Sequence, residues 1–304
     1  MQLRVSVGGD VLVSIIIPTY NSARTLAKCL ESVEKQTLDD YEVIIVDGLS
    51  RDSTREVALK WIKSTDPSRH KYIDVPYRFQ AIKRNIGVKA SCGKWVFFLD
   101  SDQYMLPRLL EVAVNYAEER GVGALRIPEV PVFKKSALAR AENIIKYPRG
   151  YRVAHYRLFE RSVFSRVGLQ DPRIPYVEDL DFFYRMEVAG IKLGELPLIK
   201  DAYLLHDEVI SIRSVLLKRY YIGVGTARVV WKLKGVRSRV FYKYFASGSQ
   251  EGARLFSKYR RFLARAKRDP STIIPLMTLI PLRAFAMRLG FYLEVLSLKY
   301  KKPE

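Results

Sequence analysis

Cysteine is scarce in this sequence. Only Cys29 and Cys92 occur among 304 residues, and no CxxC pair or Cys/His cluster is present. This pattern excludes a disulfide framework and a cysteine-based zinc site. Reduced thiols in a cytoplasmic setting are the simplest expectation.

Long hydrophobic runs are also missing. No uncharged apolar stretch reaches the roughly 18 residues typical of a membrane span. The longest candidate, residues 271–282, is interrupted by Pro275 and Pro281. The first ten residues carry no apolar run behind a basic stretch, so we expect no signal peptide.

Acidic residues are depleted in the last third of the chain. Residues 211–304 hold 21 Lys and Arg against 4 Asp and Glu, whereas residues 1–210 hold 31 against 28. The basic third therefore carries nearly all of the net charge of +20. This asymmetry predicts two domains with different partners, one at residues 1–210 and a basic extension at residues 211–304.

Short apolar runs alternate with helical patterns in the first hundred residues. We predict strands at 11–17, 41–46 and 94–99, and helices at about 23–35, 54–63 and 78–90. The first strand should end before Pro18, because proline cannot donate to a central ladder. Strands that are apolar throughout indicate a parallel sheet covered on both faces. The predicted fold class is α/β, a Rossmann-like, mostly parallel sheet flanked by helices, with a C-terminal basic amphipathic helical extension.

Polar clusters follow three of the predicted strands. They are residues 19–21 (TYN), 47–48 (DG) and 100–102 (DSD). Open α/β sheets bind ligands beyond the carboxyl ends of their strands. The three clusters therefore predict a binding site at this edge of the sheet.

Asp100 and Asp102 are candidate metal ligands. If the strand continues through them, both carboxylates lie on one face, where they repel unless a cation or a proton separates them. Such oxygen ligands suit Mg²⁺ or Mn²⁺ bound together with substrate phosphates. A loop with two solvated aspartates is the alternative.

Five motifs occur in an order that carries a resemblance. The chain resembles family 2 glycosyltransferases of the GT-A fold over about its first 210 residues, and five motifs together are far more specific than one. The motifs are residues 13–21 (VSIIIPTYN), 45–54 (IVDGLSRDST), 83–87 (KRNIG), 98–102 (FLDSD) and 177–179 (VED).

The resemblance implies a nucleotide site at the first two strand ends. Pro18, Thr19 and Tyr20 would border the base, with Asn21 beside them. Asp47 would accept a hydrogen bond from a base N–H group. The alternative for Asp47 is a structural one, in which its carboxylate caps the following turn.

The resemblance also implies a site for the diphosphate and a divalent metal. Arg84 would meet the pyrophosphate, because a guanidinium group suits phosphate oxygens. Asp100 and Ser101 would contact the donor, and Asp100 and Asp102 would hold the metal. His206, at a predicted strand end, would approach the metal or pyrophosphate. The alternatives are an arginine on a helix surface and a polar residue at an element boundary.

An acidic pair supplies the expected general base. By the resemblance, Asp179 would take the proton from the acceptor hydroxyl, with Glu178 beside it. A single displacement by an outside nucleophile inverts the anomeric centre, and the resemblance also implies inversion. Alternatively, both carboxylates only favour a helix N-terminus.

The number of sugars transferred is suggested by a departure from one family pattern. Processive members carry Gln-x-x-Arg-Trp, whereas residues 216–220 here read LLKRY. The missing glutamine favours addition of one sugar.

The predicted donor is a nucleotide-diphosphate sugar, UDP by default, and the acceptor is a hydroxyl or phosphate, including that of a lipid-linked glycan. The alternatives are a nucleotidyltransferase, disfavoured by the absence of an early Gly-rich loop, and a non-enzymatic lipid- or nucleic-acid-binding scaffold.

The basic extension predicts contact with an anionic membrane surface. Basic amphipathic helices bind such surfaces, and residues 273–282 are apolar enough to dip in but too short to span. Arg283 and Arg288 would reach the headgroups. A peripheral location on the cytoplasmic face follows. Nucleic-acid binding is disfavoured because no motif supports it, and plain packing on the catalytic domain is the remaining alternative. The oligomeric state is not predicted.

Overall fold

The computed structural model describes residues 11–147, 149–208, 210–233 and 269–300. These residues form two compact units. The first comprises the described residues of Met1–Glu129, Val153–Gln170 and Arg185–Asp207, and the second those of Val130–Arg152, Asp171–Tyr184 and Glu208–Glu304. The functional division at residue 210 stays a prediction.

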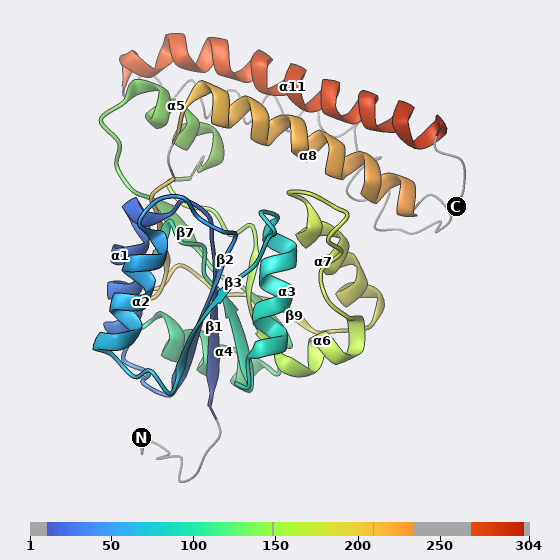
Figure 1. The fold of residues 1–304 in the computed structure, drawn as a ribbon. Coiled ribbons are helices and arrows are strands. Elements are labelled where there is room, and N and C mark those ends of the chain that lie inside the picture. The colour runs from blue at the N-terminus through green and yellow to red at the C-terminus, as the bar shows by residue number, and fades with distance from the viewer. Residues whose placement is uncertain (1–10, 148, 209, 234–268, 301–304) are drawn as a thin grey trace. The chain divides into compact units, whose positions relative to one another are not determined.

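A seven-stranded sheet forms the centre of the first unit (Figure 1). Strands β1 to β4 pair in parallel, whereas β8 runs antiparallel to both β4 and β6. The predicted mostly parallel α/β fold is therefore confirmed. In spatial order the strands are β3 (His70–Asp74), β2 (Tyr41–Asp47), β1 (Val13–Thr19), β4 (Trp95–Phe98), β8 (Tyr156–Glu160), β6 (Ala124–Arg126) and β9 (Leu193–Glu195).

Strand β3 was not predicted, for a physical reason. It is an edge strand with only its first residue buried, so it lacks the continuous apolar run by which β1, β2 and β4 were found.

Helices cover both faces of this sheet. The main core joins α1 (Ala23–Glu34), α2 (Thr54–Ser64) and α4 (Leu109–Arg120) to one face, and a smaller cluster joins α3 (Gln80–Ala90) to the other. Helix α3 lies close to β1, since a Cβ at Gly87 would come within 2.4 Å of Ile16 Cγ2. The glycine of the KRNIG motif therefore sets how near α3 approaches the sheet.

The first strand runs through Pro18, contrary to prediction. Pro18 pairs in register with Val46, and β1 ends at Thr19. The carbonyl of Ile16 accepts from Leu99 on the β4 side, so Pro18, two residues on, turns its nitrogen to the same side. Strand β4 has already ended at Phe98, and hence the missing N–H group interrupts no ladder.

A second sheet has three strands, in the order β5 (Gln103–Met105), β10 (Leu204–His206) and β7 (Glu129–Pro131). Strands β5 and β10 pair antiparallel, and His206 lies opposite Gln103. This register brings His206 to the turn that contains Asp100 and Asp102. Two further short helices are α6 (Arg161–Val167) and α7 (Glu178–Val188).

The second unit contains two long helices, α8 (Ile212–Leu233) and α11 (Ile273–Tyr300), which lie side by side (Figure 1). Glycines permit the close contact. A Cβ at Gly223 would lie 2.0 Å from the Met287 carbonyl oxygen, and one at Gly290 would lie 2.1 Å from that of Tyr220. The unit also holds α5 (Ala137–Lys146) and the 3-10 turn η2 (Pro270–Thr272).

Helix α11 corrects an expectation. It continues through Pro281 instead of breaking there, and its segment Pro270–Leu298 has the length and composition of a membrane span. The predicted absence of such a segment overlooked that a few charged residues do not exclude one. Within the structure only 22% of this stretch is buried. The other part of the extension, residues 234–268 and 301–304, lies outside the described residues.

Candidate active site

The adjacent ends of β1 and β2 bring Thr19 and Asp47 together. Asp47 Oδ1 accepts hydrogen bonds from Thr19 Oγ1 at 2.7 Å and from Ser50 Oγ at 2.6 Å, and its Oδ2 accepts from the Ser50 N–H at 2.7 Å. The side chain is 1% exposed. Asp47 therefore caps the turn after β2, which was the structural alternative, and these bonds hold its carboxylate in one orientation.

The loop that follows β1 is tied to the same turn. The N–H of Asn21 donates to Ser50 Oγ at 2.7 Å, and its side-chain oxygen accepts from the Arg51 N–H at 2.8 Å. Asn21 adopts a left-handed backbone with φ of 49°, which asparagine tolerates better than most residues. The Arg78 guanidinium lies 4.8 Å from the centre of the Tyr20 ring. A flat, electron-rich surface thus stands beside Asp47.

Two arginines enclose the carboxylate of Asp100. Arg84 Nη2 is 2.8 Å from Oδ1, and Arg157 Nη1 is 2.8 Å from Oδ2. Burial by itself would raise the pKa of Asp100, but the two guanidinium groups outweigh it and hold that pKa well below its usual range. Asp100 is therefore a permanent anion at neutral pH.

Sequence reasoning missed Arg157. It lies on β8, 57 residues beyond Asp100, and is 3% exposed. The only sequence signal was a charged residue inside the short strand YRLFE, and a buried arginine generally needs a paired carboxylate.

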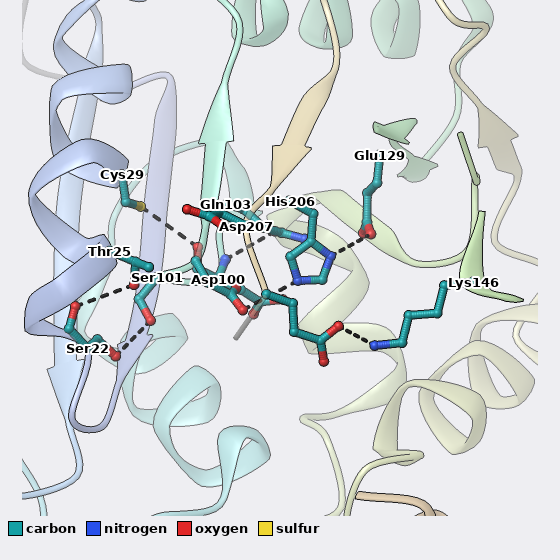
Figure 2. Close-up of polar contacts among 12 residues, drawn as sticks. Ser22, Thr25, Cys29, Asp100, Ser101, Gln103, Glu129, Lys146, His206 and Asp207 are labelled. Carbon is teal, nitrogen blue, oxygen red and sulfur yellow. Dashed lines mark hydrogen bonds and ion pairs between the residues drawn. The ribbon is translucent and has the colours of Figure 1, made fainter. Parts of the chain in front are cut away.

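A chain of ionic contacts runs on from Arg157 to Asp102, and Figure 2 shows its middle contact, between Glu129 and His206. Arg157 Nη2 is 2.9 Å from Glu129 Oε1, Glu129 Oε2 is 3.6 Å from His206 Nδ1, and His206 Nε2 is 3.4 Å from Asp102 Oδ2. Burial would lower the pKa of His206, but the carboxylates of Asp102 and Glu129 raise it to about 9. His206 therefore carries a proton at neutral pH, and its single positive charge lies between the carboxylates of Asp102 and Glu129.

The two aspartates do not lie along one strand, so the condition under which both carboxylates would share one face is not met. Strand β4 ends at Phe98, and Asp100 to Asp102 form a turn. The carboxylates take different partners, Asp100 the two arginines and Asp102 the histidine. Between them, Ser101 Oγ donates to Ser22 Oγ at 2.9 Å. The repulsion expected between the aspartates is thus relieved by cationic side chains of the protein itself.

The donor set for a metal ion is small. Within the described ranges, no group of three or more His, Cys, Asp and Glu side chains is arranged as a metal site. Asp102 Oδ2 and His206 Nε2 are 3.4 Å apart, whereas both oxygens of Asp100 already bind arginine. Two protein ligands suit Mg²⁺ or Mn²⁺, which commonly complete their coordination with water and substrate phosphates.

Glu178 and Asp179 begin α7 in the second unit, where Glu178 is buried and Asp179 half-buried. Both carboxylates, with Asp181, fall in the first turn of the helix, where its dipole favours negative charge. Asp179 is the more accessible of the predicted pair.

The burial of Lys83 should make the free energy of unfolding depend on pH. Its Nζ donates to the Thr19 carbonyl at 2.7 Å, and the residue is 4% exposed. Burial lowers the pKa of Lys83 to about 8, although Asp47 opposes the shift. Between this value and the ordinary pKa of 10.5, the unfolded chain binds more protons than the folded one. The free energy of unfolding should therefore contain a contribution that rises from about pH 8 to about pH 10.5.

Urea unfolding at several pH values checks this expectation. The variant Lys83→Met should show a flatter profile in that window than the parent protein. Lys89→Met, which removes an exposed lysine from the same helix, is the matched control and should keep the parent slope. An identical slope in Lys83→Met would show that Lys83 is not the titrating group.

Comparison with known protein families gives a match over about half of the chain. A sequence profile described as Glycosyl transferase family 2 matches residues 14–168, about half of the chain. The poly(ribitol-phosphate) beta-N-acetylglucosaminyltransferase TarP of Staphylococcus aureus is 33% identical over 167 residues, which cover 51% of this chain and 50% of TarP. The UDP-Glc:alpha-D-GlcNAc-diphosphoundecaprenol beta-1,3-glucosyltransferase WfgD of Escherichia coli is 36% identical over 107 residues, 35% of this chain and 41% of WfgD.

A solved structure also shares the fold. The mannosyltransferase PcManGT from Pyrobaculum calidifontis, in complex with GDP-Man and Mn²⁺, superposes with a TM-score of 0.59 at 17% identity and covers 97% of this chain and 89% of that one. At this identity the likeness shows the fold alone, and it bears out the predicted GT-A architecture. The chain spans half or less of the length of the two curated relatives.

Proposed function

The chain belongs to glycosyl transferase family 2, and on that premise we propose that it transfers one sugar from a nucleotide-diphosphate sugar to an acceptor, with inversion at the anomeric carbon. The observation that carries the proposal is the meeting of Thr19, Asp47, Asp100 and Asp102 at the carboxyl edge of one parallel sheet. Donors bind beyond this edge in open α/β folds. The nucleotidyltransferase and scaffold alternatives gain no support from the relatives described above.

We assign the nucleotide to the turn around Asp47. The loop of Pro18 to Asn21 would border the base, with the Tyr20 ring on one side, and Asp47 would accept from the base N–H. Three hydrogen bonds already orient its carboxylate, so binding needs no rearrangement of that group. Arg84, held on Asp100, would meet the diphosphate, and Ser101 would contact the donor beside it.

Asp102 and His206 would hold a divalent metal, while Asp100 acts mainly through its arginines. A bound Mg²⁺ or Mn²⁺ would neutralise the charge that develops on the leaving diphosphate. His206 must lose its proton to become a ligand, so metal and proton compete for this residue. The neighbour PcManGT, crystallised with Mn²⁺, supports a metal in this fold.

Asp179 is the proposed general base, with Glu178 beside it. A helix N-terminus favours a negatively charged side chain, and a carboxylate placed there is able to accept a proton from an acceptor hydroxyl. Relatives that act on poly(ribitol-phosphate) and on a diphosphoundecaprenol-linked sugar support a polymer or lipid-linked glycan as the acceptor. The name of WfgD includes UDP-Glc, which supports UDP as the donor nucleotide. PcManGT was crystallised with GDP-Man, so GDP is the second candidate.

Thermal unfolding in the presence of nucleotides tests the donor site. A ligand that binds only the folded protein stabilises it, by about 2.7 kcal/mol at a hundredfold excess over Kd. We expect UDP or GDP, but not both equally, to raise the melting temperature, and Mn²⁺ to enlarge that rise. If neither nucleotide raises it, with or without Mn²⁺, the proposed function is wrong.

We also propose that α11 docks on an anionic membrane surface at the cytoplasmic face. Its exposed apolar side chains recur at helical spacing along one stripe, and they include Ile274, Met277, Phe285, Tyr292 and Leu296, each at least half exposed. The opposite side is already packed on α8 through Gly223 and Gly290. A helix with one face taken by protein and the other apolar suits the plane of a bilayer better than a crossing.

One predicted headgroup contact is wrong. Arg283 turns inward to pair with buried Glu142, and its side chain is only 11% exposed. Arg288 is exposed and remains the residue proposed to reach a headgroup.

Sedimentation with vesicles tests the membrane proposal. The protein should sediment with phosphatidylglycerol vesicles at low salt and less at high salt, because charge attraction is screened. The double variant Met277→Asp/Phe285→Asp should lose most of this binding, since it places two charges on the apolar stripe. Ser297→Asp, exposed on another side of the same helix, should bind as before. If both variants lose vesicle binding equally, the loss follows from the change in net charge, and the proposed docking surface is wrong.

A further inference from the structure

A basic hollow lies within the second unit, and its lining includes none of the residues assigned above to the donor, the metal or the acceptor proton. It is formed by α5, by the start of α8 and by the segments that precede α7 and α8. Its polar lining consists of Glu142, Lys146, Tyr176, Glu208, Ser214, Lys218 and Arg219.

Positive charge is in excess around this hollow. Four cationic side chains pair with two carboxylates, Glu142 and Glu208. Glu208 pairs with Lys146 and, at 3.0 Å, with Lys218. Glu142 pairs with Lys146 at 3.3 Å, with Arg219 at 3.8 Å and, more closely, with Arg283. The cationic residues are Lys146, Lys218, Arg219 and Arg283. The described ion pairs therefore leave a formal excess of two positive charges.

Part of this excess positive charge is buried. The side chains of Lys146 and Glu142 are 7% and 1% exposed. Burial, together with the nearby charge of Arg283, lowers the pKa of Arg219 to about 10, and burial and Lys218 lower that of Lys146. Cations that repel one another in a sheltered hollow are stabilised by a bound anion.

We propose that this hollow binds a phosphate group of the acceptor. A phosphate monoester carries a charge close to the excess of two, and its oxygens suit the ammonium group of Lys218, the fork of Arg219 and the hydroxyl of Ser214. That the phosphate belongs to the acceptor rests on the proposed function, whereas phosphate binding itself rests only on the charges of the hollow.

The position of Tyr176 supports an acceptor over a donor group. This residue lines the hollow and stands two positions before Glu178 in the same unit, and the charge of Glu178 helps raise the pKa of Tyr176 after the larger effect of burial. Its backbone takes a left-handed φ of 63°, and its ring stacks on Tyr221 with centroids 5.9 Å apart. A strained residue held in place by stacking is common at binding sites. The hollow thus lies near the proposed general base.

Calorimetric titration of the full chain with glycerol 3-phosphate tests the site. Lys218→Gln removes the most exposed of the four cations, at 40%, and should weaken binding at least about tenfold, as expected for a lost charge-assisted hydrogen bond. Arg213→Gln removes an exposed charge from the same helix outside the hollow, and it should leave binding within about twofold.

A second arm distinguishes a soluble phosphate from a lipid headgroup. Vesicles of phosphatidylcholine with phosphatidate present the same phosphate monoester on a bilayer. Dependence on Lys218 but not Arg213 supports the site in either arm, and the arm with the tighter binding names the source. Equal weakening by both variants, or no saturable binding in either arm, overturns it.

The same samples separate this inference from the proposed function. Stabilisation by UDP or GDP reports the first unit alone. If a nucleotide stabilises the protein while no phosphate binds in a Lys218-dependent way, only the hollow is wrong. If the phosphate binds and no nucleotide does, the sugar-transfer proposal fails and the phosphate site stands.

Discussion

Replacing Arg157 by methionine is expected to lower the free energy of unfolding by about 3–5 kcal/mol, the range seen when one partner of a buried ion pair is removed. Arg157 bridges Asp100 and Glu129 at 2.8 and 2.9 Å. Methionine fills a similar volume but removes the guanidinium group that pairs with Glu129, which is fully buried. Urea unfolding followed by circular dichroism measures the loss.

The control for this variant is an exposed pair of the same chemistry. Arg55 lies 3.0 Å from Asp74 with its side chain 60% exposed, and Arg55→Met should cost less than about 1 kcal/mol. A double variant, Arg157→Met/Glu129→Gln, should recover part of the loss because one uncompensated buried charge is removed. A loss for Arg157→Met no larger than for Arg55→Met would mean that this chain of ionic contacts contributes little to stability.

Asp102→Asn is expected to lower kcat at least about a hundredfold, the scale seen when one group that stabilises transition-state charge is lost. The amide keeps the shape of the side chain but is a poor metal ligand. Since Asp102 is 31% exposed and 3.4 Å from His206, the loss of this ion pair should cost about 1 kcal/mol or less of stability. A sugar-release assay, run beside thermal unfolding, separates the two effects.

The nucleotide shifts make this prediction specific to the metal site. In Asp102→Asn, the Mn²⁺-dependent part of the stabilisation by the diphosphate should disappear, whereas the part seen without Mn²⁺ should persist. Asp66→Asn changes an exposed carboxylate in the loop before β3 and should behave like the parent protein. A fully active Asp102→Asn protein would show that Asp102 does not hold a metal ion that the reaction needs.

The fold was predictable because its signals are local. The strands β1, β2 and β4 are buried on both faces and so read as continuous apolar runs. The helices between them begin and end within two residues of the predicted positions. The half-buried edge strand β3 and the position of Pro18 inside β1 were not predictable in this way, because each depends on which neighbouring strand is present.

The site was only partly predictable. The motifs placed Asp47, Arg84, Asp100 and Asp102 at one edge of the sheet, and the register of β10 brings His206 there as expected. Their roles in catalysis stay predictions, as does the role of Asp179. Motifs gave no indication that both oxygens of Asp100 are held by arginines.

The sequence by itself determined the α/β class, the family and the residues at the strand ends, because hydrophobic runs and short motifs are read from neighbouring positions. Only the tertiary structure decided which charges meet. Arg157 reaches Asp100 through the antiparallel register of β8 against β4, and His206 reaches Asp102 through the register of β10 against β5. Long-range strand register has no local signature in the chain, since a shift of one residue reverses the face of every side chain.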